Sequence, residues 1–385
     1  MPIQRPESVA ELGELIKQAR SLRQGVFPIG GRTTLDVGMQ PLKAGFAIDT
    51  TALNRVIDYP ARDMTITVQS GITIAGLHAQ LAKEGQWLPL DVSEPEKATL
   101  GGAIALNQSG PHRYGYGTLR DYVIGISFLT DEGVEVKAGG RVVKNVAGYD
   151  LMKLQTGALG TLGIVTQVTL KVKPRPESSS AVIFQCDASS LDAFLNQLHA
   201  SASRPVVVEL LNPKAREQLD AFPAPNAGSG WSVAVGFEEK ATTVRWQLST
   251  LLSELKSTPP LEVIEVSDSS KLWAAIAGMQ TRPESRFIGK ESVLSSKLAA
   301  YVQEVGSRSP GALIHAHALN GVVWVHSANQ IPHRENLTLR RCPAELKSNL
   351  GVWGKPASDW DLKRHIKKTL DPDNVFNPGR MFGDL

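Results

Sequence analysis

The sequence predicts an α+β fold in two lobes, and three observations lead to this prediction. Within residues 1–174, short strands run into glycine-rich turns, and glycine lets a backbone lie directly against a ligand because it has no Cβ. A connector rich in proline and serine, Pro174–Ser180, then interrupts the pattern. The segment after it alternates in the order β-α-β-β-α-β, the ferredoxin-like arrangement.

In the first lobe, apolar residues at helical spacing predict a helix that begins at a capping box of Ser8 and Glu11. Thr73 is expected to cap a second helix, which ends at Gly85. Residues 122–129 and 134–136 have the pattern of a hairpin. The other expected strands are 26–29, 45–49, 56–58, 64–69 and 163–172.

The second lobe is expected to begin with four strands, 181–186, 205–211, 231–237 and 261–266, and two helices, 190–200 and 242–255. Helices 271–279 and 297–305 and strands 312–318 and 322–327 should follow. Ser358 and Asp361 predict the cap of a last helix. We therefore expect three segments: a ligand-binding domain of residues 1–174, a cap domain of residues 175–345 with a ferredoxin-like core, and a C-terminal segment of residues 346–385 that returns to the first domain.

Composition excludes several classes of protein. The chain has 385 residues, 42% of them hydrophobic, and a net charge of +3, which argues against nucleic acid as a partner. Its 2 cysteines, Cys186 and Cys342, cannot form a zinc or iron–sulfur cage and indicate a reducing compartment. The sequence shows neither a signal peptide nor a membrane span. We expect a cytoplasmic protein that reaches a membrane only through a partner.

Three glycine-rich turns, 28–34, 99–118 and 157–165, carry the functional prediction. Each by itself is compatible with an ordinary tight turn or surface loop. Together they favour one long ligand with a diphosphate, because successive backbone N–H groups can form an anion-binding concavity. The expected cofactor-binding residues are Pro28, Gly30, Gly31, Arg32, Thr33, Thr34, Thr99, Gly101, Gly102, Ser109, Gly110, Arg113, Tyr116, Gly117, Arg120, Gly163, Ile164 and Val165.

Histidines are the only candidate catalytic side chains that the pattern offers. His315 and His317 lie two apart on an expected strand and therefore face the same side, with His326 on the next strand. Such a trio could bind a metal or accept a proton. Hydrogen-bonded imidazoles in the protein interior explain it equally well, since no carboxylate is near in sequence, and we expect no metal.

Taken jointly and in this order, PIGGRTT, VQSG, TLGGAIALNQSG, RYGYGTLRDYVIG and GTLGIVTQVTLKVKP resemble the flavin adenine dinucleotide (FAD)-binding domain of the vanillyl-alcohol oxidase and p-cresol methylhydroxylase (PCMH) family. The closing NPGR, Asn377–Arg380, is similar to the end of its 2-hydroxy-acid dehydrogenases. The resemblance implies a two-lobed PCMH-type FAD-binding domain under a cap, and FAD as cofactor. The first turn has no histidine, so we expect FAD to be bound without a covalent link.

Three further segments, among them VVKNVAGYDLMKL (142–154), resemble the FAD-binding subunit of bacterial glycolate oxidases. That resemblance implies electron transfer within a complex, with a larger FAD-containing subunit, an iron–sulfur subunit and a small 2-hydroxy acid as substrate. HAHALNGVVWVH (315–326) lacks the Asp of the Gly-Asp-Gly-Asn-x-His pattern in catalytic relatives, so we expect little oxidation by the isolated chain. The alternatives are a self-sufficient FAD-dependent 2-hydroxy-acid dehydrogenase such as a D-lactate dehydrogenase, a cell-wall-precursor reductase of related fold, and a non-catalytic supporting subunit.

Overall fold

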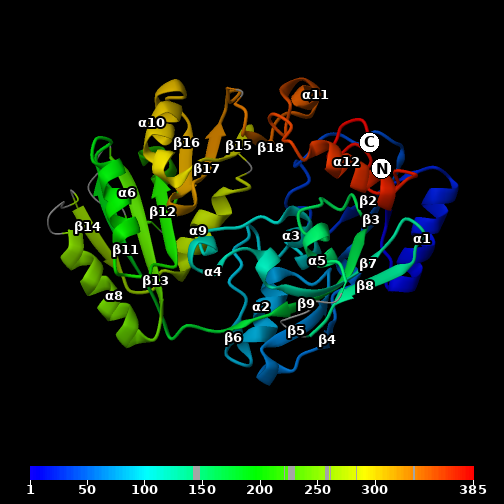
Figure 1. Cartoon of the computed structure of the whole chain (residues 1–385), viewed down its shortest axis with the longest axis horizontal. Helices are drawn as coiled ribbons and strands as arrows, with labels where there is room; N and C mark the ends of the chain where they lie inside the picture. Colours follow the sequence, from blue (N-terminus) through cyan, green and yellow to red (C-terminus); the bar gives the residue numbers. More distant parts are fainter. Residues whose placement is uncertain are drawn as a thin grey trace.

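The computed structural model describes residues 1–141, 148–220, 222–223, 230–255, 260, 262–282, 284–332 and 334–385. Residues 142–147 of the motif 142–154, and residue 261 of the expected strand 261–266, lie outside this description. The chain forms two lobes, one built from the N-terminal part and the C-terminal tail, the other from the middle of the chain (Figure 1). Strands and helices are mixed in both lobes, and the expected α+β class is confirmed.

The first lobe contains two sheets. A parallel sheet in the order β1-β3-β2 packs against helix α1, and together they form one hydrophobic core. An antiparallel sheet in the order β4-β5-β9-β7-β8 forms the second core with helices α2 and α3. The bounds are β1 (Ile3–Gln4), α1 (Val9–Ser21), β2 (Gly25–Ile29), β3 (Gly45–Asp49), β4 (Val56–Asp58), β5 (Thr65–Gln69), α2 (Ile74–Ala82), α3 (Leu100–Leu106), α4 (Arg113–Tyr116), β7 (Val123–Leu129), β8 (Glu135–Gly139), α5 (Leu151–Gln155) and β9 (Ile164–Lys171), with the short pair β6 (Gln86–Trp87) and β10 (Lys173–Pro174) beside them.

The cap begins with the predicted ferredoxin-like unit. Its strands lie in the order β14-β11-β13-β12 and are antiparallel throughout, with two helices in the crossover connections. The bounds are β11 (Ser178–Cys186), α6 (Leu191–Ala200), β12 (Val207–Leu211), α7 (Pro213–Arg216), β13 (Trp231–Glu239), α8 (Ala241–Glu254) and β14 (Glu262–Val266). The prediction of β-α-β-β-α-β for this segment is confirmed.

The second half of the cap repeats this topology. The sequence pattern did not predict the repeat. β15, α10, β16, β17 and β18 follow in chain order, and the strands lie in the order β16-β17-β15-β18. The two halves meet at antiparallel β12 and β16, so that each contributes its second strand to the seam of one eight-stranded sheet. The bounds are α9 (Ser270–Met279), β15 (Phe287–Ser292), α10 (Leu298–Arg308), β16 (Leu313–His317), β17 (Val322–Ser327) and β18 (Thr338–Arg341).

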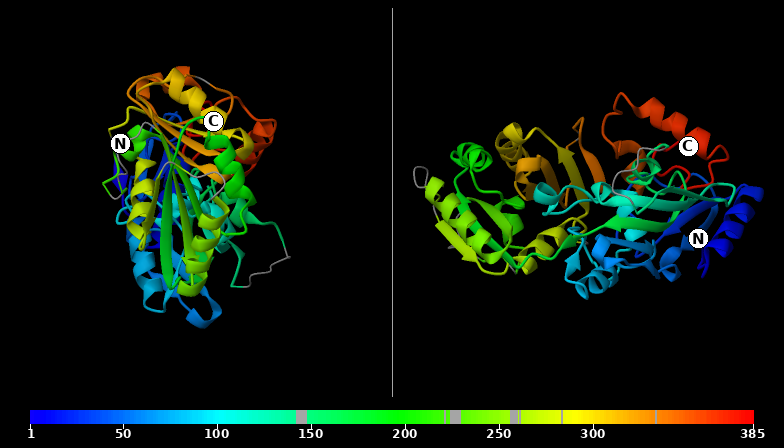
Figure 2. Two further views of the ribbon diagram at one scale, coloured as in Figure 1. Left: turned by 90° about the vertical axis from the view of Figure 1, so that its left-hand side faces the viewer. Right: turned by 60° about the horizontal axis from the view of Figure 1, so that its bottom comes forward.

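The two faces of the cap sheet have different roles. One face packs under α6, α8 and α10 and forms the largest apolar core. The other face packs partly on α9 and partly toward the first lobe, as the two views in Figure 2 show. Alternation along the strands places Glu209, His317, His315, Trp324 and Lys290 on this second face. Polar side chains of the cap are therefore presented to the first lobe.

Two local predictions were wrong. The stretch 99–118 was interpreted as an extended glycine-rich loop, but Leu100–Leu106 is helix α3 and Arg113–Tyr116 is α4. Leu100, Ala103 and Ile104 are buried in the core, so apolar packing outweighs the low helix propensity of the two glycines. At the other end, α12 (Trp360–Leu370) is preceded by Asp359 without a side-chain cap hydrogen bond, rather than being capped by Ser358.

The tail rejoins the first lobe after α12. The Val26 N–H donates to the Val375 carbonyl at 2.7 Å, and the Asn377 N–H donates to the Val26 carbonyl at 2.9 Å. Val375 and Phe376 are buried in the core beneath α1. We propose the same division for the folded chain as for the sequence, namely 1–174, 175–345 and 346–385. No helix in the part of the chain that the structure describes is long and apolar enough to cross a membrane.

A buried charged network joins the lobes. His112 of the first lobe lies between two carboxylates, with its Nδ1 2.7 Å from Asp91 Oδ1 and its Nε2 3.0 Å from Oε1 of Glu238 in the cap. Tyr116 also donates to Glu238, at 3.1 Å. Burial lowers the pKa of His112, but the two carboxylates outweigh burial and raise it to about 10. The imidazolium is therefore the charged form that holds the lobes together at neutral pH.

This network predicts a pH-dependent stability. Because the folded-state pKa of His112 lies above its unfolded value, its contribution is fully present below about pH 6.5 and is lost as pH rises through about 10. His112→Gln should lower the free energy of unfolding at pH 7 by roughly 1–3 kcal/mol, since it leaves buried carboxylates without their partner. The same variant should also show a smaller decline in the free energy of unfolding between pH 7 and 10, measured by urea titration. His199→Gln, at an exposed histidine of α6, is the control. If the free energy of unfolding declined with pH equally in the wild type and both variants, His112 would not be the group responsible.

Candidate active site

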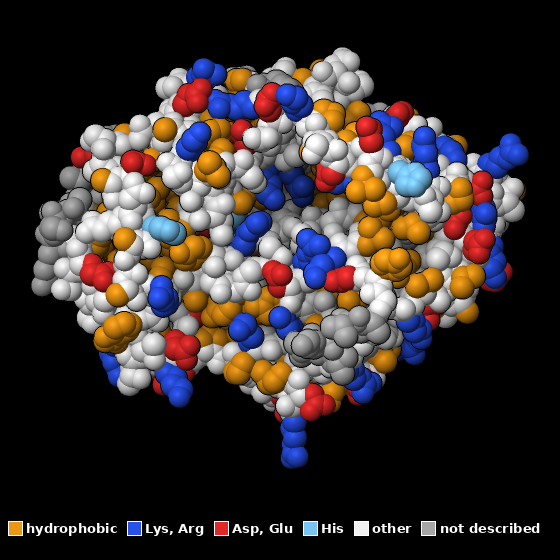
Figure 3. Space-filling view, in the orientation of Figure 1, with side chains coloured by type: hydrophobic (Ala, Val, Ile, Leu, Met, Phe, Trp, Pro, Cys, Tyr) orange, Lys and Arg blue, Asp and Glu red, His pale blue; other side chains and the backbone are white. Residues whose placement is uncertain are grey.

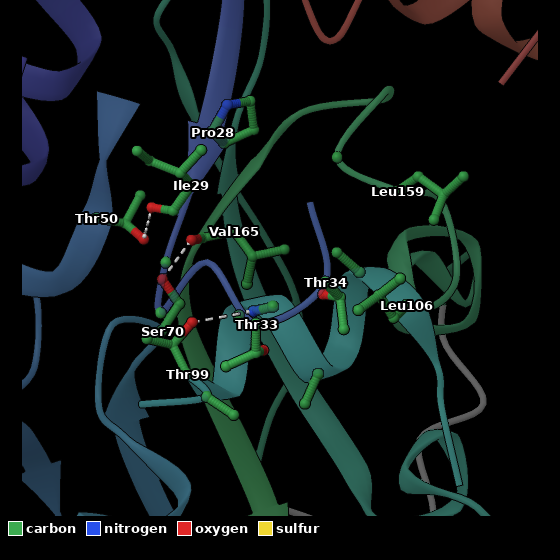
Figure 4. A pocket seen from close by; sticks show the side chains of 18 of the residues that line it. Pro28, Ile29, Thr33, Thr34, Thr50, Ser70, Thr99, Leu106, Leu159 and Val165 are labelled. Carbon is green, nitrogen blue, oxygen red and sulfur yellow. Dashed lines mark hydrogen bonds between the residues drawn. The ribbon is translucent and has the colours of Figure 1, made fainter. Parts of the chain in front are cut away.

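The main cavity lies in the first lobe on the side that faces the cap. The space between its walls, including the open solvent at its mouth, is about 1100 Å³. Its wall combines the turn after β2, the end of β5, the start of α3 and the turn before β9 (Figure 4). The lining residues are Pro28, Ile29, Gly30, Gly31, Arg32, Thr33, Thr34, Leu35, Thr50, Ser70, Val92, Ser93, Ala98, Thr99, Gly101, Gly102, Ala103, Ala105, Leu106, Gln108, Gln155, Leu159, Gly160, Gly163, Ile164, Val165, Thr281, Asn377 and Arg380.

The first glycine turn packs on the second. A Cβ on Gly30 would lie 2.1 Å from Thr99 Oγ1, and a Cβ on Gly31 would lie 1.8 Å from the Lys97 carbonyl oxygen. These two glycines are therefore required by contact between segments of the protein. The sequence analysis attributed them to the approach of a ligand, which is not the first reason for their presence.

Gly102 differs from Gly30 and Gly31. A Cβ there would meet only Thr99 Oγ1, at 3.3 Å, and the space beyond belongs to the cavity. The surrounding backbone is fixed by hydrogen bonds. Ser70 Oγ donates to the Val165 carbonyl at 2.5 Å (Figure 4), and the Gly101 N–H donates to the Ser70 carbonyl at 2.7 Å. This is the position where the backbone itself offers room to a ligand.

The predicted cofactor-binding residues fall into two groups. Those of the first turn, the start of α3 and the turn before β9 line the cavity: Pro28, Gly30, Gly31, Arg32, Thr33, Thr34, Thr99, Gly101, Gly102, Gly163, Ile164 and Val165. The others do not line it: Ser109, Gly110, Arg113, Tyr116, Gly117 and Arg120. Gln108 lies within the predicted stretch 99–118 but was not singled out there. Thr281 was missed because only the folded cap brings it to the wall, and Asn377 and Arg380 were noted only as part of a terminal motif.

The segment after α3 connects the lobes instead of forming the cavity wall. Gln280 of the cap donates to the Ser109 carbonyl at 2.9 Å, and the Gly115 N–H donates to the Val206 carbonyl at 2.9 Å. A Cβ on Gly115 would lie 2.5 Å from Val206 Cα of the cap. Its small residues therefore allow the lobes to meet closely.

A smaller hollow, which we call the smaller cavity, adjoins the main one and reaches toward the cap. Its open space, solvent included, is about 260 Å³. The two cavities share Thr33, Thr34, Gln108 and Thr281, and Arg340 of β18 lines only the smaller one. Arg340 donates to Gln108 Oε1 at 3.2 Å, while Gln108 donates to Gln280 Oε1 at 2.5 Å. The guanidinium of Arg340 is therefore held at the boundary between the lobes.

Arg113, Lys290, Arg340 and Arg380 form what we call the cationic cluster. Burial lowers the pKa of Lys290 to about 7, assisted by the charges of Arg340 and Arg113. Burial also lowers the pKa of Arg340 to about 10, assisted by Arg380. None of the four forms an ion pair within 4.0 Å among the described residues. Asp36, which lines the smaller cavity and pairs with Arg341, acts on Arg380 only through its charge. Figure 3 shows Lys and Arg side chains gathered in the hollow between the lobes.

This cluster suits an anionic ligand. Cations withdrawn from water without a counter-ion cost free energy, and a bound anion removes that cost. The Nε atoms of Arg340 and Arg380, and Oδ1 of Asn377, are also buried without a hydrogen-bond partner in the described structure. Unsatisfied groups of this kind at a cavity wall are available to a ligand.

The histidines lie outside the cavity wall. His317 Nδ1 is 2.6 Å from Glu209 Oε1, and its Nε2 is 3.3 Å from the Ser109 carbonyl, so both ring nitrogens contact partners. Glu209 is the carboxylate that sequence proximity could not reveal, because β12 and β16 are neighbours only in the sheet. His315 Nε2 is 3.2 Å from His326 Nε2, and the His315 ring stacks on Trp324.

Burial keeps the other two histidines neutral. It lowers the pKa of His326 to about 3 and that of His315 well below its ordinary value. No group of three or more His, Cys, Asp or Glu that could hold a metal ion occurs in the described ranges. The cationic cluster and the two cavities are therefore better placed than the histidines to bind a ligand.

Comparison with known proteins identifies a cofactor. Residues 3–139 match the model of a family described as an FAD binding domain. A mitochondrial D-lactate dehydrogenase [cytochrome] of Arabidopsis thaliana is 33% identical over 98% of this chain and 72% of its own length. Glycolate oxidase subunit GlcD of Bacillus subtilis is 22% identical over 98% of this chain and 88% of its own length.

Two further comparisons bear on fold and on the narrower resemblance. The solved structure of an alkyldihydroxyacetonephosphate synthase superposes with a TM-score of 0.71 at 20% identity, over 98% of this chain and 75% of that one. This likeness and the family match confirm the PCMH-type fold. Glycolate oxidase subunit GlcE of Escherichia coli is 38% identical, but over only 35% of this chain and 39% of its own length. The specific identification with the FAD-binding subunit of glycolate oxidases is therefore not supported.

FAD is the cofactor of this chain, and the cavity fits it. The open backbone at Gly102 leaves room for a ligand, and Arg380 and Asn377 present unsatisfied polar atoms at the cavity wall. Arg380 would face the negative charge of the cofactor, and when bound FAD supplies a two-electron acceptor.

Gly102→Val should abolish FAD binding while the protein still folds, because the valine side chain would enter the open space of the cavity. The measurement is titration of the apoprotein with FAD, followed by flavin fluorescence, together with a urea titration. Gly278→Val is the matched control, since Gly278 is also helical but an added Cβ there meets nothing within 4 Å. Full flavin content in Gly102→Val would show that the ligand lies elsewhere.

Proposed function

This chain belongs to the family of FAD-dependent oxidoreductases of 2-hydroxy acids, and from that premise we propose that it is a self-sufficient dehydrogenase of a small 2-hydroxy acid. The proposal includes FAD held without a covalent bond. Relatives that align over nearly the whole chain support it, since D-lactate dehydrogenase and GlcD both match 98% of the chain. It replaces our expectation from the sequence, in which the chain was mainly an electron-transferring subunit.

The observation that carries the proposal is the cationic cluster beside the smaller cavity. A 2-hydroxy acid is an anion at neutral pH, and a guanidinium binds a carboxylate through two parallel hydrogen bonds. Arg340 is held for this task by Gln108, which Gln280 of the cap in turn contacts. We assign Arg340 to the substrate carboxylate and Lys290 to a second, electrostatic contact with it.

The arrangement positions the substrate between the lobes. The cap contributes Arg340 and Gln280 to the wall of the smaller cavity, and the first lobe contributes Gln108 and the cofactor cavity. Lys290 lies outside both walls and interacts with Arg340 through its charge. A substrate bound by its carboxylate at Arg340 would direct its hydroxyl-bearing carbon toward the main cavity, because the two cavities adjoin there. The covering cap would keep bulk water away from the reacting carbon.

Membership of a complex is the second candidate function. The local match to GlcE favours it, and so does the involvement of both nitrogens of His317 in contacts with Glu209 and Ser109. Under this alternative the chain would pass electrons between a larger FAD-containing subunit and an iron–sulfur subunit. It would then need no substrate site of its own.

Anaerobic mixing of the purified, FAD-loaded chain with glycolate, D-lactate or D-2-hydroxyglutarate separates the two candidates. The proposal predicts rapid bleaching of the flavin absorbance by at least one of these acids. No bleaching by any of them, with bleaching restored by added partner subunits, would support the complex. Acid precipitation of the same sample should leave the flavin in the supernatant, and colour in the pellet would contradict the non-covalent assignment.

Replacing Arg340 tests the carboxylate assignment. Arg340→Met should raise KM by roughly 10- to 100-fold, the equivalent of losing about 1.5–3 kcal/mol of charge-assisted hydrogen bonding. The measurement is steady-state oxidation with a dye as electron acceptor. FAD content should stay normal, because Arg340 does not line the main cavity. An unchanged KM would remove Arg340 from the substrate site.

Lys290 predicts a pH dependence of the same reaction. Because its pKa is lowered to about 7, its charge is present below that pH and is lost above it. The kcat/KM for an anionic substrate should therefore fall as pH rises through about 7, and this step should vanish in Lys290→Met. Lys297→Met, at an exposed lysine of the same lobe, should keep it. A step that persists in Lys290→Met belongs to another group.

A further inference from the structure

Lys367 is an unusual lysine. It lies on α12, the helix near the end of the chain that Figure 1 shows against the first lobe, and it is only 2% exposed. Fully buried lysines are rare unless they are paired. Lys368, the next residue, is exposed, so burial is specific to position 367.

The ammonium group of Lys367 is saturated with partners. It donates to the Thr161 carbonyl at 2.9 Å, to the Phe376 carbonyl at 2.9 Å, and to the carboxylate of Asp371. Asp371, which is 1% exposed, accepts the N–H groups of Val375 and Phe376, each at 2.8 Å. The pair therefore fixes the turn 371–376 and ties it to Thr161.

Thr161 belongs to the third glycine turn, residues 157–165, which lines the main cavity through Leu159, Gly160 and Gly163, among others. Asn377, which follows the turn 371–376, donates to the Leu159 carbonyl at 2.7 Å and to the Gly160 carbonyl at 3.3 Å. Three successive carbonyls of the glycine turn are thus bound by two side chains of the tail. Lys367 does not line the cavity.

The glycine turn needs such support. Leu159 and Gly160 both have left-handed backbone, with φ of 56° and 63°, and a non-glycine residue in that region is strained. Without partners, the three carbonyls would turn toward water and the segment would populate other conformations. Apparent affinity falls in proportion to the population of the competent conformation.

We propose that Lys367, Asp371 and Asn377 form a clamp that holds the third glycine turn in its FAD-binding conformation, with Lys367 as a positioning residue that acts from outside the cavity. The clamp makes the C-terminal tail a determinant of FAD affinity. This inference requires FAD in the main cavity but is independent of the substrate and of partner subunits. A buried ion pair by itself adds little stability, so its effect should appear mainly in cofactor binding.

The first test compares apoproteins of the full chain by titration with FAD. Lys367→Met should raise the Kd for FAD by about tenfold or more, whereas Lys368→Met on the same helix should leave it unchanged. Since Lys367→Met leaves the Asp371 charge buried and alone, the double variant Lys367→Met, Asp371→Asn removes both charges and retains an acceptor for the turn 371–376. It should unfold in urea near the wild-type midpoint and still bind FAD weakly.

FAD affinity and the urea midpoint together distinguish a failure of the clamp hypothesis from a loss of folding. A double variant with wild-type FAD affinity, or with a lower unfolding midpoint at unchanged FAD affinity, would make Lys367 a structural residue only. Hydrogen exchange on the wild-type apoprotein gives an independent measurement. Amides of residues 157–163 should already be protected without FAD, and protection that arises only after FAD is added would refute a preset turn.

Discussion

Uncompensated positive charge between the lobes is the constraint on which this structure depends. Arg113, Lys290, Arg340 and Arg380 are brought together from four separate parts of the chain, without a carboxylate partner among the described residues. Two other buried groups of charges are paired with each other, namely Asp91–His112–Glu238 and Lys367–Asp371. The paired charges stabilise contacts within the protein, whereas the charges of the cationic cluster are available to an anionic ligand. An anionic cofactor and an anionic substrate would each meet part of the cluster.

The two kinds of charge are connected through one segment. Residues 108–117 carry Gln108, which contacts Arg340, Ser109, which contacts His317 and Gln280, and His112, which contacts Glu238. The cap is therefore attached to the first lobe by the stretch that follows α3 in the cofactor cavity. The same segment therefore borders the cofactor cavity and contacts the cap. The duplicated winding of the cap places the seam of β12 and β16, with Glu209 opposite His317, directly above this segment.

Local pattern was sufficient for much of the fold. The capping residue Thr73, the longer strands of the first lobe and the ferredoxin-like order of the cap were predicted, because each depends on neighbours in sequence. The two-residue strands β1, β6 and β10 were not predicted. β15 and β18 were missed because charged residues, Lys290 and Arg340 among them, interrupt the apolar pattern of these short strands. The glycines of the first turn were noticed, but their contacts with Lys97 and Thr99 are tertiary. Pairs such as Glu209 with His317, and Lys367 with Thr161, join residues far apart in sequence, and a single sequence carries no signal for them.

The central claim is that the cationic cluster binds the carboxylate of the substrate beside the flavin. A crystal structure of the FAD-loaded chain with oxalate, a small dicarboxylate that cannot be oxidised at a hydroxyl-bearing carbon, tests it most directly. The account predicts one oxalate in the smaller cavity, with a carboxylate on the guanidinium of Arg340 and within reach of Lys290. Oxalate bound instead near His317 and Glu209, or FAD density with the smaller cavity left to ordered water at saturating oxalate, would contradict it.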